Sequence, residues 1–136
     1  MTAHEYLMQV YYYNRKIKYD LACLDELRAF SYSISSPQFG ERVEGSKSTD
    51  PPFVRALEKI FDKEAEINAE IAKLNSLKEE IQGVIEQLPN VDERFVLLYR
   101  YIHNMTWEDI SLELHLSVSS VRRLCSRGLK NIVVPE

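Results

Sequence analysis

The sequence has few residues that break regular structure, with four glycines and five prolines among 136 positions. This shortage favours long helices over a many-stranded β fold. It has two cysteines, Cys23 and Cys125, which are far apart in the chain, so a disulfide scaffold is excluded and reduced thiols in the cytoplasm are expected. No run approaches the ~20 apolar residues of a membrane span. The N-terminus lacks a basic segment followed by an apolar one, so no signal peptide is expected.

Catalytic and metal-binding patterns are also missing. The three histidines, His4, His103 and His115, have spacings that match no metal-ligand set. The sequence has no glycine-rich phosphate loop, no Ser/His/Asp grouping and no convincing carboxylate pair. We therefore predict that the protein is not an enzyme, with no catalytic site, no metal and no cofactor.

Apolar residues recur at helical spacing through the first thirty positions. They predict a helix from about His4 to Phe30, with an apolar seam that includes Leu7, Val10, Ile17, Leu21 and Leu24. Serine, glycine and proline then replace this pattern over residues 31–52. A segment of that length and composition predicts a mobile loop.

A second, longer helix is predicted over residues 51–88, with Asp50 as its cap. Its seam alternates at spacings of four and three for five heptads, which is typical of a coiled coil. Glu64 and Lys78 interrupt the seam and are candidates for setting register. The economical arrangement packs the two helices as an antiparallel hairpin, and the uncovered heptads then need the C-terminal residues or a second chain. Residues 1–88 are thus predicted to form a helical hairpin or coiled-coil domain.

Residues 89–136 are predicted to form a second, compact helical domain. Asn90, Thr106 and Ser117 each precede a helical pattern and can cap it. These caps predict one helix after Asn90, a second over residues 107–114 and a third from residue 118 to about residue 131. The inward face of the first is predicted from four apolar side chains: Phe95, Leu98, Tyr99 and Ile102.

The last two helices fit a helix-turn-helix motif. Its apolar positions are supplied by Ile110, Leu114, Leu116, Val121 and Leu124, and the small residue that allows close crossing is Ser111. His115 stands where the turn usually has glycine, and histidine tolerates the required positive φ better than most residues. Trp107 is expected to anchor the core of this domain.

The stretch from Arg100 to Ile132 reads RYIHNMTWEDISLELHLSVSSVRRLCSRGLKNI. It resembles region 4 of the sigma-70 family. With the coiled region that precedes it, the layout resembles the small phage-encoded ArpU/RinA-like late-transcription regulators. The resemblance implies sequence-specific binding of double-stranded DNA and transcription control, with RNA polymerase as a further candidate partner, in the cytoplasm of a bacterial host cell.

Charge is divided unevenly along the chain. The net charge is −4, yet residues 91–136 hold six basic and six acidic side chains, and the last helix holds four basic residues and no acid. In the major groove, a recognition helix uses its N-terminal half to contact base edges. The candidate DNA-binding residues are Ser117, Ser119, Ser120, Arg122, Arg123, Arg127 and Lys130, with the last two over phosphates.

The sequence therefore predicts an all-α protein that joins a helical hairpin or coiled coil to a sigma-region-4-like helix-turn-helix domain. Its predicted function is that of a DNA-binding regulator of phage or prophage origin, acting in late-gene control, as a homodimer formed through the coiled region and without a membrane partner. Two alternatives are a coiled-coil scaffold and a DNA-packaging protein of the terminase-small-subunit type.

Overall fold

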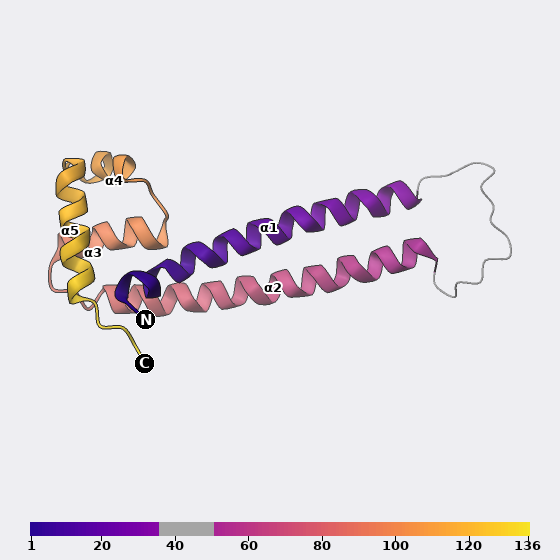
Figure 1. The fold of residues 1–136 in the computed structure, drawn as a ribbon, viewed down its shortest axis with the longest axis horizontal. Helices are drawn as coiled ribbons and strands as arrows, with labels where there is room; N and C mark the ends of the chain where they lie inside the picture. The colour runs from indigo at the N-terminus through magenta and orange to yellow at the C-terminus, as the bar shows by residue number, and fades with distance from the viewer. Residues whose placement is uncertain (36–50) are drawn as a thin grey trace. The chain divides into compact units, whose positions relative to one another are not determined.

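The computed structural model describes residues 1–35 and 51–136, and the regular structure of these residues is entirely helical. In chain order the helices are α1 (Ala3–Ser35), α2 (Pro52–Ile85), α3 (Val91–Leu97), the π-helix η1 (Leu98–Ile102), α4 (Trp107–Leu114) and α5 (Val118–Asn131) (Figure 1). The all-α prediction is confirmed. Among these helices, none is both long enough and apolar enough to cross a bilayer.

The chain divides into two compact units. The first unit comprises Met1–Arg15 and Ala72–Glu136, and the second unit comprises Lys16–Ile71. The start of α1 and the end of α2 therefore belong with the C-terminal helices. The predicted division at residue 88 stays a prediction.

Both long helices differ slightly from the sequence-based ranges. α1 continues to Ser35, so the first residues of the predicted loop are helical, whereas residues 36–50, including the predicted cap Asp50, lie outside the described residues. α2 ends at Ile85 because a tighter turn follows, in which the Leu88 N–H donates to the carbonyl of Ile85 at 3.0 Å.

The second unit is an antiparallel pair of helices, as predicted. Leu24 of α1 packs with Ile60 and Ile67 of α2 in its core. Among the polar seam residues, Glu64 accepts a hydrogen bond from the Arg28 guanidinium at 2.6 Å. This cross-helix ion pair joins two half-exposed side chains, so its contribution is to the register of the helices more than to stability.

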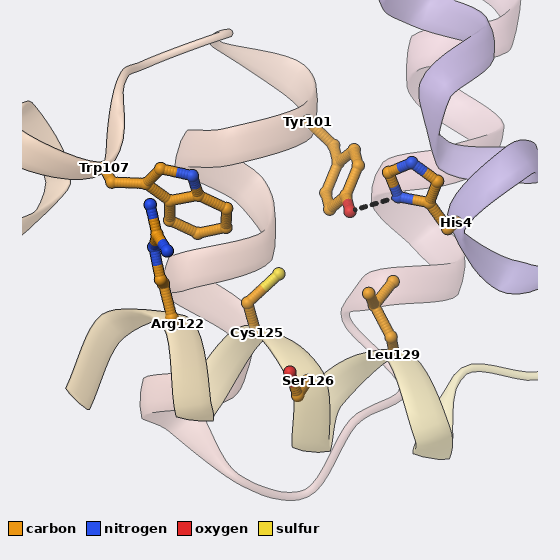
Figure 2. Close-up of a pocket in the computed structure, with 7 residues that line it drawn as sticks. All are labelled: His4, Tyr101, Trp107, Arg122, Cys125, Ser126 and Leu129. Atoms are coloured by element: carbon orange, nitrogen blue, oxygen red, sulfur yellow. Dashed lines mark hydrogen bonds between the residues drawn. The ribbon is translucent and has the colours of Figure 1, made fainter. Parts of the chain in front are cut away.

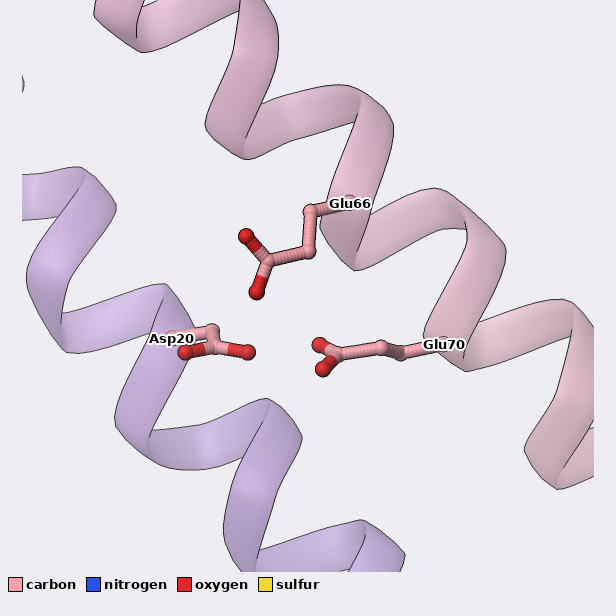
Figure 3. A group of neighbouring side chains, drawn as sticks. All are labelled: Asp20, Glu66 and Glu70. Carbon is pink, nitrogen blue, oxygen red and sulfur yellow. The ribbon is translucent and has the colours of Figure 1, made fainter.

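Three carboxylates approach one another between α1 and α2 of the second unit (Figure 3). Asp20, Glu66 and Glu70 each offer an oxygen within 4.8 Å of the others. The ammonium of Lys16 lies 2.7 Å from Asp20 and 2.9 Å from Glu70, and Lys63 lies 3.6 Å from Asp20. The hydrogen bond from Lys16 holds the pKa of the buried Asp20 carboxyl below its ordinary value. The two lysines balance much of the acidic charge, so the cluster is a packed ion-pair network.

The first unit has its own core, to which every α-helix of that unit contributes. Its fully buried side chains are Leu7, Val10, Ile81, Ile85, Val96, Leu97, Ile110 and Val121. The Tyr6 hydroxyl on α1 also donates a hydrogen bond to Glu80 on α2. The first turns of α1 are thus an integral part of the unit that carries the helix-turn-helix.

The inward face of α3 and η1 differs in part from the one predicted: Ile102 is buried as predicted, and Leu98 and Tyr99 are half-buried. Phe95 is 43% exposed and stacks on Tyr99 instead of entering the core. The buried apolar side chains are Val96, Leu97, Tyr101 and Ile102. The step of five residues from Val96 to Tyr101 and from Leu97 to Ile102 matches the i→i+5 bonding of a π-helix, which the α-helical spacing used for the prediction does not contain.

Candidate nucleic-acid interface

The turn between α4 and α5 has the predicted geometry. His115 adopts φ 57° and ψ 43°, the left-handed conformation, and its N–H donates to the carbonyl of Ser111. The Ser111 hydroxyl donates to the carbonyl of Leu116, so the small side chain at this position closes the turn as well as allowing the helices to cross. The turn therefore holds α5 in a fixed direction relative to α4.

Side-chain caps set the start of each helix in this region. The amide of Glu93 donates to Asn90 Oδ1 at 3.0 Å, and the amide of Asp109 donates to Thr106 Oγ1 at 3.1 Å. Ser117 caps α5 in the same way, since its Oγ accepts from the amide of Ser120 at 3.1 Å. All three predicted caps are confirmed.

α5 packs closely against the helices beneath it. Val121 is fully buried, as is Ile110 on α4. Gly128 is buried against α3, where an added Cβ would lie 2.9 Å from Leu97 Cδ1. A glycine is therefore needed for this close approach, and α5 presents its opposite face outward.

The outward face of α5 carries most of the candidate DNA-binding residues. Six of the seven are exposed: Ser117, Ser119, Arg122, Arg123, Arg127 and Lys130. Ser120 is half-buried, and the hydroxyl of Ser117 is engaged with the amide and hydroxyl of Ser120. The exposed Ser126 lies on the same face, one turn after Arg122, and its helical spacing from Ser119 could have identified it. The DNA-binding role of these residues remains a prediction.

Ion pairing distinguishes the two units. Within residues 1–35 and 51–136, the ion pairs that join two described residues lie in the second unit and involve Lys16, Arg28 or Lys63. The four basic side chains of α5 have no acidic partner in this part of the chain. They are therefore available to an external anion without first breaking an internal ion pair.

Trp107, the first residue of α4, is half-buried rather than the core anchor that was predicted. The guanidinium carbon of Arg100, on η1, lies 4.2 Å from the centre of the indole ring. Arg122 lies over the same ring, with its guanidinium carbon 5.5 Å from the centre. The indole thus contacts two cations from two other helices, and sequence spacing offered no signal for Arg100.

A cavity of about 370 Å³ adjoins this aromatic contact (Figure 2). Its lining residues are His4, Tyr101, Trp107, Arg122, Cys125, Ser126 and Leu129. His4 Nδ1 and the Tyr101 hydroxyl are joined by a hydrogen bond of 2.8 Å, which ties α1 to η1. Burial raises the pKa of the Cys125 thiol, so the thiol stays protonated at neutral pH.

Comparison with known proteins agrees with the motif. Residues 78–132 match the family model described as Sigma-70, region 4. The chain therefore carries a sigma-region-4-like helix-turn-helix domain, and domains of this kind bind DNA and RNA polymerase without catalysing a reaction. No curated protein and no solved structure was found to match the chain.

Proposed function

We propose that the protein is a sequence-specific DNA-binding transcription regulator that places α5 in the major groove of duplex DNA. One observation carries the proposal: the outward face of α5 displays four cations that have no ion-pair partner within the described residues. The match to a sigma region 4 domain supports the same function.

The basic residues divide by their place on the helix. Arg122 and Arg123 lie in the N-terminal half of α5, which in helix-turn-helix proteins contacts base edges. Arg127 and Lys130 lie one and two turns further and suit phosphate contacts, which add affinity without sequence preference. The exposed Ser119 and the half-buried Ser120 lie beside the base-reading arginines, whereas Ser117 first serves as the cap of α5.

A salt titration tests this division on duplexes enriched from a random pool, with binding followed by fluorescence anisotropy. Arg122→Ala and Arg123→Ala should each weaken binding by about 1–3 kcal/mol where the arginine contacts guanine. Arg127→Ala should lower the slope of log K against log salt by about 1. The matched control is Lys18→Ala, which removes an exposed charge from the second unit and should leave the affinity for DNA unchanged. Equal effects of Lys18→Ala and Arg122→Ala would contradict the proposal.

The second unit supports a further part of the proposal, which is that the protein acts as a homodimer. A pair of helices buries one apolar seam, yet this unit keeps Tyr19, Phe30 and Phe61 more than half exposed. A second copy would cover such side chains in a four-helix arrangement. Sedimentation equilibrium of the full chain should show a dimer that Phe61→Glu dissociates, whereas Leu112→Glu, at an exposed site of the first unit, should not. A monomeric wild-type chain would refute dimerisation.

The regulatory setting completes the proposal. The layout of two long helices followed by a region-4-like domain resembles that of phage-encoded ArpU/RinA-like regulators, and this resemblance supports a proposed role in late-gene control in a phage or prophage. RNA polymerase is the second proposed partner. The exposed side chains of Val91 and Phe95 on α3 offer it an apolar surface that is distinct from the outward face of α5.

A further inference from the structure

We propose that Trp107 positions Arg122 for contact with DNA, so that an aromatic residue on the first helix of the motif acts through an arginine on the second. This inference rests on the proposed function and adds a residue that the sequence had suggested only for the core. The observation behind it is the placement of the Arg122 guanidinium over the indole ring (Figure 2).

The indole of Trp107 is itself held in place by Arg100, which lies on η1. Arg100 Nη1 donates a hydrogen bond of 2.9 Å to the carbonyl of Met105, in the turn that precedes α4. Its guanidinium carbon lies 4.2 Å from the centre of the Trp107 ring, which is close cation–π contact. The Arg100 guanidinium is held by the Met105 carbonyl while it contacts the indole. Trp107 is thereby fixed in position and offers Arg122 a fixed surface.

Within the described residues, the Arg122 guanidinium has no other polar contact that could orient it as the indole does. It forms no ion pair and no side-chain hydrogen bond to any residue in the described ranges, and the cavity of about 370 Å³ lies beside it. Because this cavity is empty space beside Arg122, close packing on that side does not hold the Arg122 side chain in place. The indole ring is therefore the contact that limits the rotamers of Arg122.

A cation–π contact of this kind leaves the guanidinium able to bind DNA. The Arg122 guanidinium lies 5.5 Å from the ring centre and makes no side-chain hydrogen bond within the described residues, so its N–H donors remain for DNA. A free arginine loses considerable rotamer freedom when it docks, and pre-orientation removes part of that cost. A partly exposed cation–π contact corresponds to about a two- to fivefold change in an equilibrium constant.

The contact can be tested without DNA, because Trp107 is the single tryptophan of the chain. Selectively excited indole fluorescence of the full chain should change in intensity or position in Arg122→Ala. It should stay close to wild type in Arg123→Ala, which removes the same charge one residue further on. Identical spectra for wild type and Arg122→Ala would overturn the stacking contact.

A double-mutant cycle tests the effect on binding with duplexes enriched from a random pool. Trp107→Leu should weaken binding about two- to fivefold when Arg122 is present and should have almost no further effect in Arg122→Ala. In Arg123→Ala the loss should remain, since that side chain does not touch the indole. Trp107→Phe keeps an aromatic face and should weaken binding less than Trp107→Leu does. Circular dichroism checks that each variant is folded.

The outcomes separate the inference from the proposed function. If the wild-type chain enriches no duplex, the proposed function fails and the role of Trp107 fails with it, while the fluorescence comparison still decides whether the contact exists. If Trp107→Leu weakens binding equally with and without Arg122, Trp107 has a structural role alone. If Trp107→Leu strengthens binding, the indole sequesters Arg122, and the inference is wrong.

Discussion

Two glycines in the first unit provide a matched test of how closely α5 packs. In the middle of a helix, alanine is more favourable than glycine by about 1 kcal/mol. Gly83 lies in the last turn of α2, where a new Cβ would meet no atom within 4 Å, so Gly83→Ala should raise the free energy of unfolding by about 0.4–1 kcal/mol.

At Gly128 the same substitution meets a fully buried side chain. The new Cβ would lie 2.9 Å from Leu97 Cδ1 and 3.2 Å from Leu97 Cγ, and Leu97 is itself 0% exposed. Forcing such a contact in a packed core costs about 1–3 kcal/mol, which offsets or exceeds the gain in helix propensity. Gly128→Ala should therefore be less stable than Gly83→Ala by about 1–3 kcal/mol.

Urea unfolding followed by the fluorescence of Trp107 measures both variants, since the tryptophan and the two glycines belong to the same unit. The free energies of unfolding should rank Gly83→Ala above wild type and wild type at or above Gly128→Ala. Equal stabilisation by the two substitutions would refute the close packing of α5 against α3.

Three further predictions concern single residues. His115→Gly should raise the free energy of unfolding by about 1 kcal/mol in urea titration, because glycine adopts φ 57° without strain. Asp20→Asn should lower it by about 1–3 kcal/mol at neutral pH. Because the pKa of Asp20 is lowered on folding by Lys16, that contribution is present above the ordinary carboxyl pKa and is lost on acidification, so the two proteins should converge in acid. With a thiol reagent at neutral pH, mass spectrometry should show Cys23 modified first, since Cys125 is buried with a raised pKa.

Local features of the fold could be predicted from the sequence because the interactions that create them span a few residues. The caps at Asn90, Thr106 and Ser117 each bond to an amide three residues later. The left-handed turn at His115 depends on one residue and its neighbours. Helical periodicity likewise identified α1, α2 and the antiparallel packing of the second unit.

Features that depend on distant contacts could not be predicted in this way. A π-helical turn at η1 moves the buried side chains to a spacing of five, so Phe95 is exposed where the α-helical pattern placed it inside. The contacts of Trp107 with Arg100 and Arg122 join three helices, and no spacing along the chain relates them. The same holds for the hydrogen bond between His4 and Tyr101, which lie 97 residues apart.

The central claim is that α5 recognises a particular sequence of duplex DNA. Its most direct test is selection of bound fragments from a random duplex pool by the full-length chain, in parallel with Arg122→Ala and Arg123→Ala. The wild-type protein should enrich one shared sequence, and the variants should lose that enrichment or relax it at individual base pairs. A pool that stays random with the wild-type protein, or that is enriched equally by the variants, would contradict the claim.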